Sequence, residues 1–142
     1  MKNSPFIDKR LELRQIPEIN GWGVFTTDLI KEGELIEISP VILIPKKLID
    51  IAIWACQADG IPNKDLMLDQ YTLRWGDNLA CPLGWVGLYN HSDNNNAMFV
   101  GEHEKNLIGI VTIKDINPGQ QVLVYYSDVW FAEKGYITKV NL

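Results

Sequence analysis

The sequence is poor in the residues from which disulfide scaffolds and metal centres are built. It has 2 cysteines, Cys56 and Cys81, and 2 histidines, His91 and His103, among 142 residues. Two cysteines are too few for a disulfide framework or a four-thiolate zinc site, and each lies among apolar neighbours, which favours a buried, reduced thiol. His103 has only glutamates nearby, without the spacing of metal ligands, and is expected in a solvated turn. We therefore expect no metal site.

The sequence also lacks a surplus of basic residues and any long apolar run. Its formal net charge is −5, whereas a nucleic-acid-binding domain normally carries a basic patch for phosphates. No apolar run approaches the ~18 residues of a membrane-spanning helix, and the N-terminal stretch MKNSPFIDKR has no apolar signal region. We expect an intracellular, cytoplasmic protein that binds neither nucleic acid nor membrane directly, with a nuclear or secreted-effector location left open.

What is present is typical of one globular domain. Hydrophobic residues make up 46% and charged residues 22% of the chain, which are ordinary proportions for a globular protein. The length suits a single domain over residues 1–142, and no internal repeat, low-complexity tract or linker marks a boundary within it.

Short runs of β-type residues, separated by turn signals, predict most of the secondary structure. The turn signals are Asn20-Gly21, Lys31–Glu34 and Asn117–Gly119. Pro40 lacks an N–H, so we expect it at a strand end, a bulge or a sheet edge. The expected strands are Leu11–Ile16, Gly23–Thr27, Leu35–Ile44, Tyr71–Trp75, Ala97–Val100, Leu107–Ile113 and Gln121–Tyr126.

One segment, Lys46–Ala58, is predicted to be a helix. Its apolar residues follow the spacing of one helical face, and a glycine and a proline follow it as stop signals; these apolar positions are Leu48, Ile51, Ala52 and Ala55. Many short strands with one or two helices predict a mostly-β α+β domain made of several small sheets.

Three short motifs are ordinary when each is taken alone. Gly21-Trp22-Gly23 is typical of a hairpin turn, although its glycines also permit positive φ and a close approach of a ligand to the backbone. Asn90-His91-Ser92 is compatible with an Asx-turn or a cap. Tyr126 ends an apolar strand, where a tyrosine normally packs in the core with its hydroxyl reaching the surface.

Taken together and in order, these motifs resemble those of the SET domain, the family of S-adenosylmethionine-dependent protein lysine methyltransferases. Gly21-Trp22-Gly23 and Gly33–Ile36 stand in the places of the family's G-x-G turn and its G-E-x-I turn-to-strand. Asn90-His91-Ser92 with Asn96 resembles N-H-S-C-x-P-N, and Gly119–Val122 leads to Tyr126 at the spacing of G-E-E-L-x-x-x-Y. The likeness runs from about Leu11 to Phe131.

The sequence departs from the family pattern at several positions. Asp93 and Asn95 replace a frequent cysteine and proline, and Gln120 and Gln121 replace two glutamates, which we expect to affect strand pairing rather than chemistry. The cysteine-rich zinc segment of some members is absent, so residues 127–142 are expected to supply the pocket wall. Residues 46–78 occupy the family's variable insertion, and no functional residue is assigned there.

The resemblance implies a fold and a reaction. The fold would be β-clip-like, with several small sheets, one or two short helices and a knot-like C-terminal arrangement. The reaction would be in-line methyl transfer to a neutral lysine amine, whose deprotonation at pH 7 costs about 4–5 kcal/mol. A sulfonium about 4 Å away destabilises the ammonium by a few kcal/mol, which would supply much of that cost without a carboxylate base.

The resemblance also implies roles for particular residues. Tyr126 would be the catalytic tyrosine, and Tyr89 and Tyr125 are weaker candidates for the wall of the lysine channel. S-adenosyl-L-methionine would contact the backbone near the G-x-G turn, the Asn-His pair and an aromatic residue after the last strand; the candidates are Gly21, Trp22, Gly23, Asn90, His91, Trp130 and Phe131. His91 is expected to hold the cofactor without acting as a base.

The partner implied is a protein substrate with an exposed lysine, such as a histone-like or other basic tail, to which an acidic protein would be attracted. A homodimer that completes a groove is compatible with a domain this small. Two alternatives stay open: a SET-fold module that binds a peptide or partner with little or no transfer, and an unrelated β-rich interaction domain whose motif matches are accidental.

Overall fold

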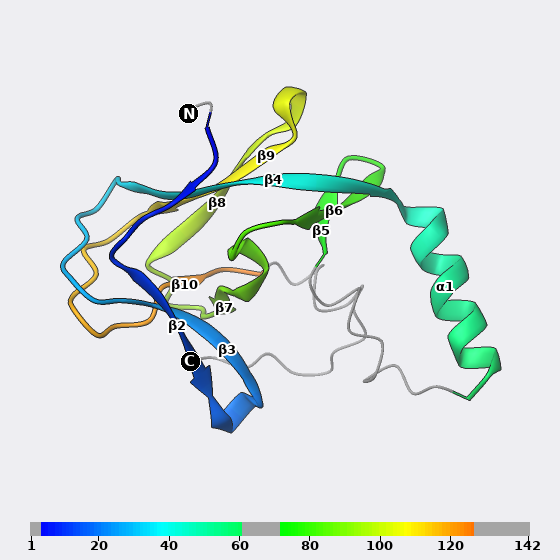
Figure 1. Cartoon of the computed structure of the whole chain (residues 1–142), viewed down its shortest axis with the longest axis horizontal. Helices are drawn as coiled ribbons and strands as arrows, with labels where there is room; N and C mark the ends of the chain where they lie inside the picture. Colours follow the sequence, from blue (N-terminus) through cyan, green and yellow to red (C-terminus); the bar gives the residue numbers. More distant parts are fainter. Residues whose placement is uncertain (1–3, 61–71, 127–142) are drawn as a thin grey trace.

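The computed structural model describes residues 4–60 and 72–126 (Figure 1). Ten strands and one α-helix make up its regular structure, together with three single-turn 3₁₀ helices. The strands are β1 (Phe6–Ile7), β2 (Leu11–Ile16), β3 (Gly21–Thr26), β4 (Leu35–Pro45), β5 (Leu73–Trp75), β6 (Asn78–Pro82), β7 (Asn90–His91), β8 (Ala97–Glu102), β9 (Leu107–Thr112) and β10 (Leu123–Val124). The helices are η1 (Pro17–Ile19), α1 (Lys46–Ala58), η4 (Val86–Leu88) and η5 (His103–Lys105).

The largest sheet is built around the long strand β4. Its strand order is β5-β6-β4-β9-β8, and β1 adds to β4 beside this path. Residues 36–39 of β4 are all buried, because this part of the strand has a partner on each edge and side chains packed on both faces. The hydrophobic run that predicted the strand is therefore the centre of the sheet.

Pro40 lies inside β4, at the position where the strand changes partners. On one edge β4 pairs with β9 through Pro40, and on the other it pairs with β1 at Glu37–Ile38 and with β6 from Val41 onward. The N–H of Val41 points to the β9 side, where it donates to the Asn106 carbonyl at 3.0 Å. Because N–H directions alternate along a strand, the N–H that proline lacks would face the gap between β1 and β6. The ladder loses no bond there.

The second sheet is the hairpin of β2 and β3. The two strands pair in continuous register from Leu11↔Thr26 to Ile16↔Gly21. The connection is η1, closed by Asn20 in the left-handed conformation at φ 48°, which asparagine adopts more readily than most residues. The turn predicted at Asn20-Gly21 is thus confirmed.

Helix α1 has the predicted bounds, Lys46–Ala58, but its inward face differs from the apolar face counted in the sequence. Ile49 is buried, whereas Leu48, Ile51 and Trp54 are 57%, 51% and 70% exposed. In Figure 1 the helix leaves the end of β4 and extends away from the sheets, so few of its positions have a surface to pack on. No helix in the described ranges is long and apolar enough to cross a membrane.

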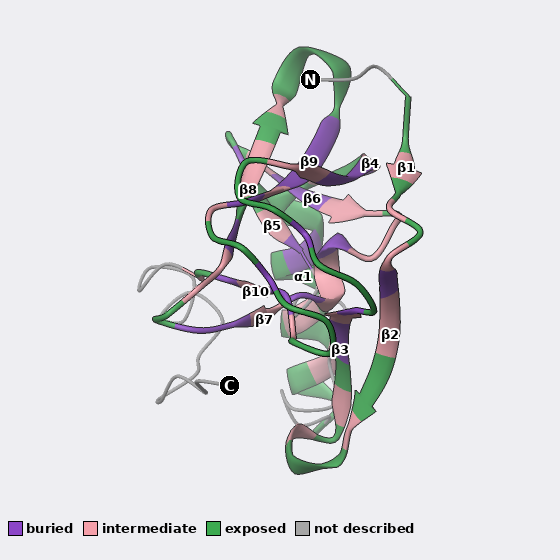
Figure 2. Ribbon diagram, turned by 90° about the vertical axis from the view of Figure 1, so that its left-hand side faces the viewer, coloured by how far each residue is buried: buried purple, intermediate pink, exposed green. Residues whose placement is uncertain are grey.

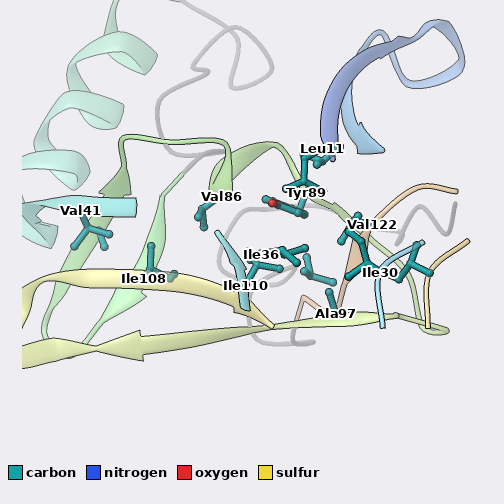
Figure 3. Close-up of a cluster of buried hydrophobic side chains, with 14 of the residues drawn as sticks. Leu11, Ile30, Ile36, Val41, Val86, Tyr89, Ala97, Ile108, Ile110 and Val122 are labelled. Atoms are coloured by element: carbon teal, nitrogen blue, oxygen red, sulfur yellow. The ribbon is translucent and has the colours of Figure 1, made fainter. Parts of the chain in front are cut away.

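The core lies where the main sheet, the hairpin and the segment around β10 meet. Its side chains come from distant parts of the chain, as Figure 3 shows for Ile36, Tyr89, Ile110 and Val122. In Figure 2 the buried residues lie mainly along the strands, whereas most of α1 and the turns at the ends of the molecule are exposed. The predicted class, a mostly-β α+β domain of several small sheets, is confirmed.

Arg10 fastens the turn after β1 to the loop before β4. Its guanidinium bonds both carboxylate oxygens of Asp8 at 2.8–2.9 Å, the Leu29 carbonyl at 3.0 Å and Glu34 at 3.0 Å. Hydrogen bonds from Arg10 hold the pKa of Asp8 and that of Glu34 below their usual values. A carboxylate whose folded-state pKa is lowered stabilises the fold above its unfolded pKa and loses this contribution as the pH falls.

Arg10→Gln is expected to lower the free energy of unfolding by about 1 kcal/mol at pH 7, because partly exposed pairs are screened by solvent even when bidentate. The loss should shrink below about pH 4, where both carboxylates become protonated. Urea unfolding of both proteins across this pH range measures the difference. Lys46→Gln, which removes a pair with Asp50 that is 59%/58% exposed, serves as the control and should have almost no effect. A loss independent of pH would contradict the ion-pair explanation.

Candidate active site

The three motifs singled out in the sequence meet at one place. The Asn90 carboxamide nitrogen donates to the Trp22 carbonyl and to Oε1 of Gln121, each at 2.9 Å. β7 and β10 pair in parallel, with Leu123 opposite Asn90 and Val124 opposite His91. The G-x-G turn, the Asn-His pair and the strand leading to Tyr126 are therefore direct neighbours, although about 100 residues of chain separate the first from the last.

The segment that carries Tyr126 passes between the β2–β3 hairpin and the loop 92–96. On the hairpin side, the N–H of Val122 donates to the Val24 carbonyl at 2.8 Å. On the loop side, the Asn96 side chain makes the hydrogen bonds that the backbone of a neighbouring strand would otherwise make. Its Oδ1 accepts the N–H of Leu123, and its Nδ2 donates to the Gln121 carbonyl. The expectation that the asparagine run holds an irregular loop in shape is confirmed, since Asn95 also bonds the Ala97 carbonyl.

The two glycines of the Gly21-Trp22-Gly23 motif, which lies in β3, differ in the space that a side chain would have. A Cβ on Gly23 would lie 2.4 Å from Oε1 of Gln121 and 2.6 Å from Cδ1 of Ile16, whereas a Cβ on Gly21 would meet nothing closer than 3.6 Å. Neither glycine has positive φ, so the conformational freedom suggested by the sequence is not used. A side chain at position 23 would displace the ends of the Gln121 and Ile16 side chains, which pack against the glycine.

Hydrogen bonds at both ring nitrogens of His91 define its orientation. Its Nδ1 accepts the backbone N–H of Tyr126 at 2.8 Å, and a backbone N–H can only donate. Nδ1 is therefore unprotonated, and Nε2 carries the hydrogen that faces Oδ1 of Asp93 at 3.0 Å. Since the Nδ1 lone pair is already engaged, the ring holds Tyr126 in place and has no lone pair left to accept a proton.

Tyr126 is held at both ends. Beyond the bond to His91, its phenol donates a hydrogen bond to the backbone carbonyl of Tyr89. Its ring lies parallel to that of Phe99, with centroids 6.4 Å apart. Tyr125, one residue earlier, is 44% exposed and lies 5.1 Å from the His91 ring. The structure thus gives Tyr126 a defined direction and leaves Tyr125 at the surface.

Tyr89, a candidate for the channel wall, is fully buried and turns its side chain into the core. Its hydroxyl donates to Oε2 of Glu37 at 2.7 Å, and only its carbonyl faces Tyr126. The pKa of Tyr89 is raised well above its usual value, first by burial and then by the Glu37 charge. Its ring therefore contributes to the support beneath the site.

Glu37 was missed by the sequence reasoning. It is fully buried in β4, and its Oε1 accepts the Ser39 hydroxyl and the Trp85 N–H, each at 2.7 Å. Burial raises the pKa of Glu37, while the hydrogen bonds from Tyr89, Ser39 and the backbone of 85–86 oppose that rise. The available signal was a single carboxylate within the apolar run Leu35–Ile38, which a strand buried on both faces cannot direct to solvent.

The remaining predicted residues divide between the surface and the parts not described. Trp22 is 50% exposed beside Asn90, whereas Trp130 and Phe131 lie outside the described residues. Within residues 4–60 and 72–126 no group of three or more His, Cys, Asp or Glu side chains could hold a metal ion.

Comparison with known proteins identifies the family of the chain. The SET domain family model matches residues 21–127. A histone-lysine N-methyltransferase of Schizosaccharomyces pombe, H3 lysine-37 specific by name, is 27% identical over 132 residues, covering 92% of this chain and 82% of that protein. The crystal structure of a candidate histone methyltransferase of Plasmodium falciparum has a TM-score of 0.61 and 26% identity, covering 88% of this chain and 99% of that one.

The chain therefore belongs to the SET-domain family. The resemblance inferred from the motifs is confirmed, and so is the enzyme class, a protein-lysine methyltransferase. The alternative of an unrelated β-rich domain with accidental motif matches is wrong, because the family match spans all three motifs.

Gly23→Ala is expected to lower the free energy of unfolding by about 1–3 kcal/mol, the usual cost of forcing an extra methyl group into a packed site. Gly21→Ala is the matched control in the same strand and should change it by less than about 0.5 kcal/mol. Denaturant unfolding of the two variants measures both values. Equal losses would show that the contact of Gly23 with Gln121 and Ile16 is not what requires a glycine.

Proposed function

We propose that this protein transfers a methyl group from S-adenosyl-L-methionine to a lysine side chain of a protein substrate. The observation that carries the proposal is the double anchoring of Tyr126, by His91 at its backbone and by the Tyr89 carbonyl at its hydroxyl. Together the two bonds restrict the Tyr126 side chain to one direction. Fixed direction is what a residue that aligns a reacting amine requires.

The residues near Tyr126 fit the cofactor. Both hydrogen-bond contacts of the Asn90 carboxamide are made by its nitrogen, and no donor from the described residues reaches its oxygen. That oxygen can accept a hydrogen bond from a ligand ammonium, such as that of the cofactor's methionine part. Trp22, whose backbone carbonyl accepts from Asn90, carries a half-exposed indole that offers an apolar surface. When bound, the cofactor supplies the methyl group and a positive charge at sulfur.

Tyr126 would orient the amine by accepting a hydrogen bond at its hydroxyl oxygen. The hydroxyl has one hydrogen, and the Tyr89 carbonyl already accepts it. Toward the substrate the oxygen can therefore act only as an acceptor, which suits the N–H of a lysine amine. The nitrogen lone pair of that amine is then left to face the methyl group.

In this proposal His91 does not act as the base that removes the lysine proton, and the hydrogen bonds of both its ring nitrogens support that assignment. The roles left to the chain are binding and alignment. Trp130, Phe131 and Tyr125 stay candidates for contact with the cofactor base and for the channel wall.

The substrate we propose is a basic protein tail, histone-like or otherwise. The net charge of −5 favours a Lys/Arg-rich partner. One relative described above is named a histone-lysine methyltransferase, and the other a candidate histone methyltransferase. A SET-fold module that binds a peptide without transfer is the second candidate; it is favoured by the replacements at Asp93 and Asn95 in the central motif. Cofactor binding without methyl transfer to any protein of a basic mixture would identify that second candidate.

Tyr126→Phe is expected to reduce methyl transfer by about 100-fold or more, because the phenylalanine ring keeps the packing but provides no acceptor for the amine. Transfer of radiolabelled methyl groups to histones and ribosomal proteins measures turnover, and calorimetry measures S-adenosylmethionine binding. Cofactor affinity should change by less than about threefold. Tyr125→Phe is the comparison and should have a much smaller effect. No heat on titration and no label on any substrate with the wild-type protein would overturn the proposed function.

A further inference from the structure

Glu37 is the most unusual buried group in the described part of the chain, and the reaction proposed above does not use it. Its carboxylate is fully buried in the middle of β4, and no ion pair of the described residues includes it. An isolated buried carboxylate is costly unless hydrogen bonds satisfy it. Its contacts therefore indicate what the group is retained for.

The two oxygens of Glu37 serve different elements. Oε1 accepts the Ser39 hydroxyl and the Trp85 N–H, and so joins β4 to the start of η4. The packing on this side is close: a Cβ on Gly84 would lie 2.4 Å from Oε1 and 1.9 Å from the Ser39 hydroxyl. Oε2 accepts the Tyr89 hydroxyl at 2.7 Å. Oε1 thus links two backbone segments, whereas Oε2 holds the hydroxyl end of the Tyr89 side chain.

Tyr89 connects Glu37 to Tyr126. Its hydroxyl is bound to the carboxylate in the core, while its own carbonyl accepts the phenol of Tyr126. Both bonds belong to one residue, which follows η4 directly and precedes the Asn90–His91 strand. A shift of the Tyr89 side chain would move the carbonyl that defines the direction of the catalytic hydroxyl.

We propose that Glu37 is a positioning residue for methyl transfer, acting through the Tyr89 side chain and carbonyl to set the direction of the Tyr126 hydroxyl. The inference rests on the proposed function, because it assigns Tyr126 the role of aligning the amine. Displacing a reacting group by about 1 Å can cost about 100-fold in rate. A support that keeps the acceptor carbonyl in place should therefore affect the rate of transfer and leave the binding of either substrate largely unchanged.

Tyr89→Phe and Glu37→Gln are the variants that test this inference. Phenylalanine keeps the ring and removes the bond to Oε2; glutamine keeps the shape and the acceptor at Oε1 but changes the group that faces Tyr89. Each should lower kcat by about tenfold, with KM for the peptide and the Kd of S-adenosylmethionine within about twofold of wild type. If Glu37→Gln does not fold, Tyr89→Phe alone decides, because its only lost polar contact is the one to Glu37.

A double-mutant cycle separates positioning from general support of the fold. Once Tyr126→Phe has removed the hydroxyl, adding Tyr89→Phe should lower kcat no further, because nothing is left to position. Ile110→Ala is the matched control: Ile110 is fully buried in β9 directly opposite Glu37. It should lower Tm at least as much as Tyr89→Phe does, with kcat unchanged at a temperature well below either Tm.

Each result has one interpretation. A wild-type protein that transfers no methyl group overturns the proposed function itself. An active wild type whose Tyr89→Phe and Glu37→Gln variants keep wild-type kcat overturns the positioning role and leaves the proposed function standing. Equal reductions by Tyr89→Phe with and without the Tyr126 hydroxyl, or a parallel fall of kcat and Tm across all variants including Ile110→Ala, also overturn it.

Discussion

The structure depends on how the segment of residues 120–126 is held between the β2–β3 hairpin and the loop that follows β7. Hydrogen bonds reach it from both sides: from β3 at Val122, from β7 through the parallel pairing, and from the side chain of Asn96 at Gln121 and Leu123. Buried main-chain groups must be paired, and a two-residue strand pairs few of them. Without the Asn96 side chain, the Gln121 carbonyl and the Leu123 N–H would lose these hydrogen-bond partners.

This constraint explains why a polar loop follows an apolar segment. The side chains of Asn90, His91 and Asn96 are used mainly to hold other parts of the chain in place, and the group proposed to align the substrate comes from a segment about 30 residues later. Gln121 fits the same arrangement. Its side-chain oxygen accepts from Asn90, and its backbone forms a bridge to Phe25. The replacement of the family's glutamate by Gln121 therefore affects the hydrogen bonds that join the motifs, because the uncharged amide accepts from Asn90.

The elements that could be predicted from the sequence are those determined by residues close together in the chain. The bounds of α1, the hairpin turn at Asn20 and the strands β4 and β9 follow from periodicity and turn chemistry within single segments. β1, β6 and β7 were missed because strands this short are defined by their partners rather than by their own sequence. The three motifs could be assigned to one site by resemblance to a family. No pattern indicated that Tyr89 would point inward, because that direction depends on where η4 places it against β4.

Glu37 shows how a cost in stability can be compatible with function in this domain. A well-packed apolar residue in the same place would avoid the desolvation of a carboxylate, and replacing buried charges by apolar groups is often stabilising. It would, however, bond neither the backbone of residues 85–86 nor the Tyr89 hydroxyl. Apolar packing tolerates small displacements of the group that it holds, whereas hydrogen bonds to a desolvated carboxylate are strong and directional. Rigidity of the carbonyl beneath Tyr126 is therefore a physical reason to keep a charge in the middle of the sheet.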